Sequence, residues 1–105
     1  MKKVECIVKS NKIQELQEAL KFIGIRGMTV SEVKGFGNQQ TRPEAYLFLP
    51  KTKIEIFAPD EDVEQIVQVI SNICKTGMPG DGKIAIYDVQ ELIRIRTGER
   101  GEVAV

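Results

Sequence analysis

The chain has 105 residues, a hydrophobic fraction of 42%, and equal numbers of basic and acidic side chains, 15 of each. This length fits one compact domain, and a formal net charge of zero gives no global field to hold nucleic acid or an acidic membrane. There is no histidine, which excludes the Ser-His-Asp and Cys-His mechanisms and removes the commonest metal ligand. We therefore expect neither a nucleic-acid partner nor a histidine-based enzyme.

The lengths of the apolar runs and the cysteine spacing indicate where in the cell the protein is expected. All of the apolar runs are far too short to span a bilayer, and the first residues lack the long apolar stretch of a signal peptide. Cys6 and Cys74 have no paired spacing and fall on expected apolar faces. We interpret them as reduced core thiols rather than a redox pair, and expect a cytoplasmic protein without membrane insertion.

The first elements are a strand and a helix. Apolar residues alternate over residues 2–9, which predicts a strand with one buried face. Apolar residues then repeat at helical spacing from 13 to 23. Ser10 and Asn11 are candidate side-chain caps, and Gly24 is a typical helix end.

Two further strands are expected in the middle of the chain. Residues 27–35 read as a second strand, followed by a polar loop over residues 36–44. Residues 45–57 read as a long third strand with a clear period of two. Pro50 predicts a bend or a sheet edge within it.

The second half repeats the pattern of the first. Asp60 is the expected cap of a second helix, whose buried stripe is formed by Val63, Ile66, Val67, Ile70, Ile73 and Cys74. A glycine-rich loop over residues 76–82 leads into a fourth strand over residues 83–88. Residues 92–96 alternate weakly and could form a short fifth strand, and residues 97–105 read as a polar tail.

This order of elements defines the fold class. The sequence β-α-β-β-α-β predicts an α+β, ferredoxin-like sandwich, in which two helices cover one face of a four-stranded antiparallel sheet. Residues 1–105 form a single domain. Apolar residues on the bare face, such as Ile7, Leu47 and Leu49, could be covered only by another subunit, which favours a homo-oligomer.

The glycine-rich loop is the first candidate site. Residues 77–83 nearly fit the phosphate-binding pattern G-x-x-x-x-G-K, but Ile84 replaces the Ser or Thr that would hold Mg²⁺. The loop also runs from helix into strand, opposite to a P-loop, so we reject an ATPase P-loop. Glycine backbone N–H groups with Lys83 could still bind an anion, and the alternative is a plain glycine turn.

Two more clusters are weaker. Arg94 and Arg96 would share one face of a strand and could fork onto a phosphate or carboxylate, unless they lie on a solvated edge strand. Residues 35–39 place two glycines at a strand end opposite Lys51 and Lys53, where Gln39 could offer an oxygen to Mg²⁺; the alternative is an ordinary loop base. Together the clusters favour binding a phosphorylated anion over transforming it.

The sequence resembles the P-II nitrogen-regulatory signal proteins over almost its whole length. The resemblance rests on Met1-Lys2-Lys3-Val4-Glu5, Gly27-Met28-Thr29-Val30-Ser31-Glu32-Val33-Lys34-Gly35-Phe36-Gly37, Phe48-Leu49-Pro50-Lys51, Thr76-Gly77, Gly80-Asp81-Gly82-Lys83-Ile84 and Arg94-Ile95-Arg96-Thr97-Gly98-Glu99-Arg100-Gly101-Glu102. It implies a homotrimer with ATP or ADP in three clefts between subunits.

The resemblance also implies residue roles. Nucleotide-binding residues would be Thr29, Gly35, Phe36, Gly37, Asn38, Gln39, Phe57, Gly80, Asp81, Gly82, Lys83, Arg94 and Arg96, with the two arginines contributed by the neighbouring subunit. Gln39 would help to hold Mg²⁺ and 2-oxoglutarate beside ATP, and Lys51 would pair with a 2-oxoglutarate carboxylate. The named loops are the T-loop at about 38–46, the B-loop at 76–83 and the C-terminal loop at 94–105.

Two positions and the length of one loop depart from the family pattern. Asn38 stands where the family usually has arginine, and Phe57 stands where a smaller aliphatic residue is usual. The T-loop is cut to a short turn, so we interpret Tyr46 as a strand residue rather than the tyrosine that is uridylylated in some bacteria. The short loop predicts weak or absent 2-oxoglutarate binding and a shorter reach toward a target protein.

The leading hypothesis is a non-catalytic trimeric sensor of adenine nucleotides. Its partner would be a protein such as an ammonium transporter or a nitrogen-metabolism enzyme. One alternative is a variant with altered or lost effector or partner binding. Others are a slow ATPase or phosphotransferase, for which Asp81 is the only evident base, and a purely structural trimer like the copper-tolerance relatives of this architecture.

Overall fold

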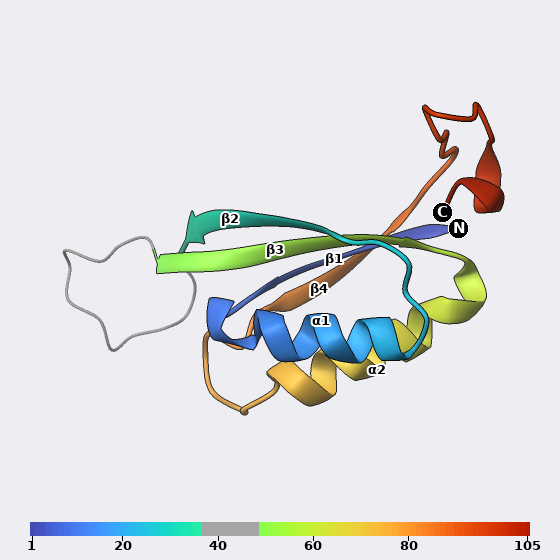
Figure 1. Cartoon of the computed structure of the whole chain (residues 1–105). Helices are drawn as coiled ribbons and strands as arrows, with labels where there is room; N and C mark the ends of the chain where they lie inside the picture. The colour runs from blue at the N-terminus through green and yellow to red at the C-terminus, as the bar shows by residue number, and fades with distance from the viewer. Residues whose placement is uncertain (37–48) are drawn as a thin grey trace.

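The computed structural model describes residues 1–36 and 49–105, in which two helices pack on one face of an antiparallel sheet (Figure 1). The strands are β1 (Lys2–Val8), β2 (Thr29–Gly35), β3 (Leu49–Ala58) and β4 (Lys83–Asp88). The helices are α1 (Ile13–Phe22) and α2 (Val63–Cys74), with short 3-10 turns at Ser10–Lys12, Asp60–Asp62 and Gly101–Ala104. The sheet order β2-β3-β1-β4 confirms the expected ferredoxin-like topology.

The core lies between the sheet and the helices. β1 and β3 send alternate side chains toward the helices, and Leu16 and Leu20 of α1 meet them from the other side. The predicted stripe of α2 is confirmed: Val63, Ile66, Ile70 and Cys74 are buried, and Val67 and Ile73 pack against the core as partly buried residues.

Both cysteines are buried in this core as free thiols, as expected. Burial raises the pKa of Cys6 to about 12, so this thiol stays protonated at neutral pH. Burial also raises the pKa of Cys74 above its usual value.

The expected helix caps are wrong at the N-termini and right at the end of α1. Each helix begins with a 3-10 turn, and within the described part of the chain no side chain caps these turns or the helices that follow. The Ser10 hydroxyl instead lies 2.8 Å from the hydroxyl of Thr52, and the Asp60 carboxylate pairs with the N-terminal amine. Gly24 ends α1 as expected, with φ +95 and an N–H donated to the carbonyl of Lys21 at 3.0 Å.

The third strand is confirmed from Leu49 onward, and its expected first part, residues 45–48, lies outside the described residues. Pro50 lies opposite Lys34 of β2, beyond the point where β1 ends at Val8 opposite Thr52. At Pro50, β3 therefore has a sheet neighbour on one side only, which is where proline is tolerated.

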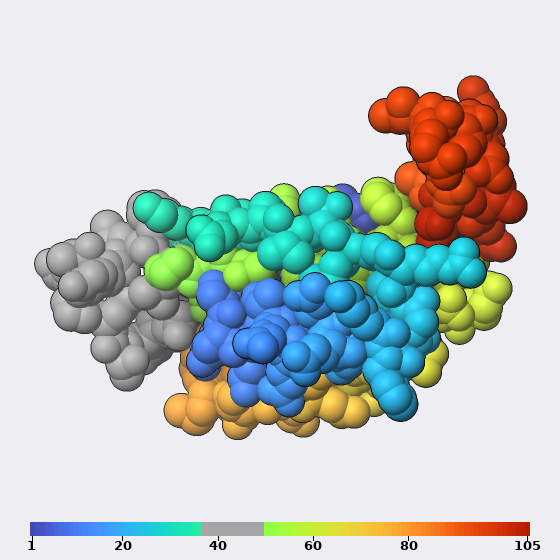
Figure 2. All heavy atoms as spheres, viewed as in Figure 1, coloured from blue at the N-terminus to red at the C-terminus, as the bar shows by residue number. Residues whose placement is uncertain are grey.

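The expected fifth strand is wrong. Ile93 makes one isolated bridge to Arg100, and residues 95–97 form a turn. Gly98 and Gly101 have positive φ values of 74 and 77, and the N–H of Gly101 donates to the carbonyl of Leu92 at 2.9 Å. The expected polar tail is thus a folded hairpin-like segment, and Figure 2 shows it standing above the sheet layer at one end of the molecule.

The bare face of the sheet is more polar at its centre than the apolar surface we expected. The register places Lys3, Glu5, Glu55 and Tyr87 there. The Lys3 ammonium lies 3.2 Å from a Glu55 oxygen, 3.5 Å from a Glu5 oxygen and 4.6 Å from the centre of the Tyr87 ring. Apolar Ile7, 38% exposed, lies on the same face, while Leu47 is outside the described residues.

Candidate functional site

The expected site residues separate into two groups at opposite ends of the sheet. β2 runs from Thr29 to Gly35, and the antiparallel β3 runs from the Gly35 end toward Phe57. Lys83 therefore lies at the same end as Gly35, because it pairs with Ile7 near the end of β1. Each end has its own pocket in this chain.

The loop-end pocket has a volume of about 480 Å³. It collects most of the residues expected around phosphate and effector: Gly35, Phe36, Lys51, Gly80, Asp81, Gly82 and Lys83. Its apolar rim contains Met78 and Pro79, which lie within the predicted glycine-rich loop but were not among the expected site residues, because two ordinary loop residues carry no pattern of their own. The pocket thus joins the glycine-rich loop to the strand ends that precede and follow the expected T-loop.

The conformation of the glycine-rich loop depends on its glycines. Gly77, Gly80 and Gly82 all have positive φ, at 85, 100 and 111. At Gly82 a Cβ atom would lie 2.0 Å from the carbonyl oxygen of Ile7, so no other residue fits there without moving backbone. The loop is therefore seated directly against the backbone of β1.

The side chain of Asp81 turns into the loop itself. One carboxylate oxygen accepts the N–H groups of Thr76 at 2.7 Å and Gly77 at 2.9 Å, and the other accepts the Thr76 hydroxyl. The hydroxyl and backbone hydrogen bonds from Thr76, together with the smaller contribution of the Lys9 ammonium 4.0 Å away, hold the pKa of this carboxyl below its usual value. Asp81 is thus an ionised acceptor that closes the loop.

Lys51 ties the loop to β3. Its ammonium donates to the carbonyl of Gly80 at 3.2 Å, so the expected effector residue lies in the loop-end pocket and contacts the expected phosphate loop. Gly37, Asn38, Gln39, Tyr46 and the expected shortened T-loop at 38–46 lie outside the described residues.

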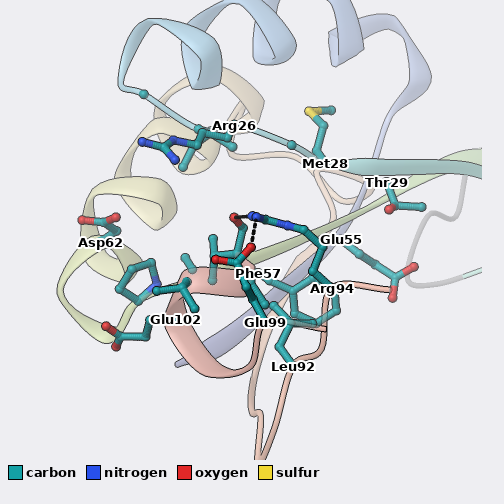
Figure 3. A pocket seen from close by; sticks show the side chains of 18 residues that line it. Arg26, Met28, Thr29, Glu55, Phe57, Asp62, Leu92, Arg94, Glu99 and Glu102 are labelled. Carbon is teal, nitrogen blue, oxygen red and sulfur yellow. Dashed lines mark hydrogen bonds and ion pairs between the residues drawn. The ribbon is translucent and has the colours of Figure 1, made fainter. Parts of the chain in front are cut away.

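The C-terminal pocket lies at the other end and has a volume of about 890 Å³. Thr29, Phe57 and Arg94 line it, together with the last residues of the chain (Figure 3). Phe57 is 37% exposed and lies beside the buried Ala58 at the end of β3. The pocket therefore combines an aromatic surface, a hydroxyl and a guanidinium.

The Arg94 guanidinium is already paired within this pocket. It donates to a Glu99 carboxylate oxygen at 2.8 Å and to the carbonyl oxygen of Val105 at 3.3 Å (Figure 3). The Thr97 hydroxyl donates to the same Glu99 oxygen at 2.8 Å. Sequence reasoning missed Glu99, although Thr97-Gly98-Glu99 has the composition of a turn that returns an acid toward a nearby arginine.

The structure does not bring Arg94 and Arg96 together as a fork. We expected both on one face of a strand, but a turn begins at Ile95, which is 98% exposed. Arg94 lines the C-terminal pocket, whereas Arg96 is exposed and does not line it. The predicted strand geometry of the pair is wrong, since among residues 1–36 and 49–105 no strand pairs with residues 94–96.

Metal binding and membrane crossing find no support in the part of the chain that the structure describes. In residues 1–36 and 49–105, no group of three or more Cys, Asp or Glu side chains is placed to hold a metal ion. Among the same residues, no helix has the length and apolar character needed to cross a membrane.

Comparison with known proteins gives the family. The sequence profile of the family "Nitrogen regulatory protein P-II" matches residues 1–99. The chain is 48% identical to the "Nitrogen regulatory protein P-II" of Pasteurella multocida and 46% identical to that of Rhizobium meliloti, in each case over the full length of both proteins. It is also 48% identical to the "Nitrogen regulatory protein P-II 1" of Escherichia coli K12, again over both full lengths.

The fold is a ferredoxin-like sandwich with a glycine-rich loop that lines a pocket at one sheet end. With full-length identities near one half, the chain belongs to the P-II family of nitrogen regulatory proteins. The alignments to the relatives named above span 112 positions, more than the 105 residues of this chain.

Proposed function

We propose that this chain is a non-catalytic signal protein that senses ATP and ADP and regulates nitrogen metabolism through contacts with other proteins. The regulatory role is supported by the names of its full-length relatives. The observation that carries the nucleotide proposal is the presence of two chemically complementary pockets at opposite ends of the sheet of one subunit, which we treat as half-sites.

The two half-sites divide the chemistry of an adenine nucleotide between them. The loop end offers glycine backbone and the Lys83 ammonium, which suit phosphate groups. The C-terminal end offers the Phe57 ring and the Thr29 hydroxyl, which suit a planar polar base, with Arg94 as a further cation. We propose that the base lies at the C-terminal end and the phosphates at the loop end.

A homotrimer would bring these ends together. Head-to-tail contacts that close into a ring place one end of a subunit against the other end of its neighbour, and three subunits then make three equal clefts. Arg94, and Arg96 by the resemblance, would reach the phosphates held by the loop of the next subunit. The bare sheet face, with exposed Ile7 on it, supports burial between subunits.

Sensing would be a shift between conformations. ATP and ADP differ by one phosphate, so they differ in their contacts with the loop-end pocket and with the residues that follow Gly35. A ligand can shift a conformational equilibrium only by its differential affinity for the two states. We therefore propose that the strand ends at Gly35 and Lys51 report which nucleotide is bound.

The chemistry of the loop supports binding over catalysis. The chain has no histidine, and the Asp81 carboxylate, the evident base of the ATPase alternative, accepts three hydrogen bonds from its own loop. A low pKa and occupied lone pairs make it a poor general base. A structural trimer without ligand would need neither this loop nor Arg94.

The effector and the partner are parts of the same proposal. Mg²⁺ would be held by Gln39 beside ATP, and 2-oxoglutarate would pair with Lys51 but bind weakly, because the T-loop that encloses it is short. Tight binding of 2-oxoglutarate in the presence of Mg-ATP would contradict this. The target is a protein such as an ammonium transporter or a nitrogen-metabolism enzyme, met in the cytoplasm.

Calorimetry with ATP and ADP tests the nucleotide proposal. We expect binding by the wild type and a loss of about 10- to 100-fold in affinity for Lys83→Ala, as is typical when a charge-assisted hydrogen bond is removed. Lys75→Ala is the matched control, because it removes the same charge just before the loop from a residue outside the loop-end pocket. Absence of binding to the wild type at millimolar nucleotide would sink the proposal.

A further inference from the structure

We infer that Asp81 is a positioning residue that closes the glycine-rich loop into a preorganised phosphate site and does not itself contact the nucleotide. This inference rests on the proposed function, since it concerns the same loop. Asp81 is an acidic residue between two glycines and next to a lysine. By sequence alone, such a residue suggests direct contact with a ligand or a metal ion.

The hydrogen bonds that the carboxylate accepts all come from the loop, and the Lys9 ammonium just after β1 lies 4.0 Å from one of its oxygens. The carboxylate accepts the N–H groups of Thr76 at 2.7 Å and Gly77 at 2.9 Å, so it spans the loop from its last residues to its first. The Thr76 hydroxyl donates to the other carboxylate oxygen and accepts the N–H of Met78 at 3.2 Å. Donors on the loop therefore surround the carboxylate on both of its oxygens.

Two further contacts fix the glycines on either side of Asp81. Gly82 lies against the Ile7 carbonyl, and Lys51 donates to the Gly80 carbonyl at 3.2 Å. Asp81 sits between these two anchored glycines and closes the remaining side. With all three contacts present, the backbone N–H groups of the loop need no reorganisation before an anion binds.

The effect of neutralising Asp81 on nucleotide affinity distinguishes a positioning role from direct contact with the phosphate. A carboxylate that faces a phosphate repels it, so its neutralisation should strengthen nucleotide binding. A carboxylate that holds the phosphate loop in shape has the opposite effect, because its neutralisation releases the loop and weakens binding. A carboxylate that acts through Mg²⁺ would matter only when the metal is present.

The test uses ADP binding by calorimetry, in EDTA and then with Mg²⁺, on the wild type and three variants. We expect Asp81→Asn to weaken ADP binding about tenfold in both buffers, because a neutral amide oxygen accepts the Thr76 and Gly77 N–H groups more weakly than a carboxylate and the amide nitrogen cannot accept the Thr76 hydroxyl. Thr76→Val removes one donor and should weaken it less. Asp88→Asn, which removes an exposed carboxylate at the opposite end of β4, should leave the affinity unchanged.

Amide exchange of the ligand-free protein gives a second readout that does not depend on nucleotide. We expect faster exchange at Thr76 and Gly77 in Asp81→Asn, with the core strands still protected. Unchanged or tighter ADP binding by Asp81→Asn, or a loss seen only with Mg²⁺, overturns the inference. If the wild type binds no ADP, the proposed function is overturned instead. If amide exchange is unchanged in Asp81→Asn, that result alone overturns the claim that Asp81 closes the loop.

Discussion

The loop before β4 and the segment after it are held by different kinds of contact. Residues 76–82 are fixed by glycine backbone geometry, by the seating of Gly82 on β1 and by the hydrogen bonds of Asp81. Residues 89–105 are held by backbone hydrogen bonds, such as Arg94 N–H to the Glu99 carbonyl and Gly101 N–H to the Leu92 carbonyl, both at 2.9 Å. Ion pairs of Arg94 with Glu99 and of Arg100 with Glu91, on partly exposed side chains, add to them.

This difference predicts that the two proposed half-sites respond differently to ligand binding. If the loop binds phosphate as proposed, its closure by Asp81 and the seating of Gly82 on β1 leave little to reorganise on binding. An arginine held by a carboxylate must first exchange that partner for the ligand. The loop end thus has the features of a preorganised site, and the C-terminal end those of a site that rearranges on binding.

The largest effect is expected from Gly82→Ala. The new Cβ would lie 2.0 Å from the Ile7 carbonyl oxygen at a φ of +111, so either the loop or β1 must move. We expect a loss of about 3 kcal/mol or more in the free energy of unfolding, since backbone strain and overpacking both contribute. For a domain of this size this lowers Tm by roughly 10–20 °C in thermal denaturation.

Gly77→Ala is the matched control for Gly82→Ala. Gly77 also has a positive φ, +85, but a Cβ added there would meet no atom within 4 Å. Only the conformational penalty applies, so we expect about 1 kcal/mol. Equal losses for the two variants would show that the seating of the loop on β1 is unimportant.

The second prediction concerns the pH dependence of loop stability. Because hydrogen bonds from Thr76 and Gly77 lower the pKa of Asp81 in the folded state, its ionised form stabilises the protein above the unfolded-state pKa near ~3.9. That contribution is lost as the pH falls through the lower, folded-state pKa. We expect Asp81→Asn to melt below the wild type at pH 7, with the gap in Tm closing below about pH 4.

Thermal melts of both proteins from neutral to acid pH check this prediction. The groups that face the Asp81 carboxylate are Thr76, the backbone of Gly77 and the Lys9 ammonium. A gap that keeps its size down to pH 3 would mean that the asparagine amide acts sterically and that ionisation of Asp81 does not matter.

The smallest effect is expected from Glu99→Gln at the C-terminal end. The side chains of Arg94 and Glu99 are 33% and 45% exposed, so the loss of their ion pair should cost less than about 1 kcal/mol of stability. With its competing carboxylate neutralised, Arg94 becomes available to a phosphate. We therefore expect ADP to bind about two- to fivefold more tightly by calorimetry.

Glu102→Gln controls for the overall charge of the C-terminal pocket, which Glu102 also lines. It removes one negative charge and leaves the Arg94–Glu99 pair intact. Equal gains in affinity for the two variants would point to the net charge of the pocket, and weaker binding by Glu99→Gln would contradict the idea that Glu99 competes with ligand.

Sequence periodicity predicted the parts of the fold that depend on burial. The strand at residues 83–88 and the stripe from Val63 to Cys74 follow from which faces are apolar, and the sheet order follows from the order of elements. Local patterns were less reliable at helix starts. Ser10 and Asp60 looked like caps, but each makes a contact with a residue distant in the sequence, which no local pattern contains.

The sequence predicted which residue types form the candidate site, but only part of their spatial arrangement. Lys51 and Lys83, which belong to two separate candidate clusters in the sequence, line one pocket in the structure. The arginines did not follow their alternation, because β4 ends at Asp88 and glycines with positive φ turn the chain back at Gly98. The pairing of Arg94 with Glu99 depends on that turn, so no periodicity could have revealed it.

The central claim is that Lys83 of one subunit and Arg94 of another meet at the same nucleotide. It is tested most directly by mixing Lys83→Ala and Arg94→Ala proteins, each too weak to bind alone, and by measuring ADP binding after subunit exchange. In a ring of subunits, random exchange gives about a quarter of the clefts both intact residues, so we predict that binding at wild-type affinity returns to about that fraction of sites. No recovery of binding after confirmed subunit exchange would contradict a nucleotide site shared between subunits.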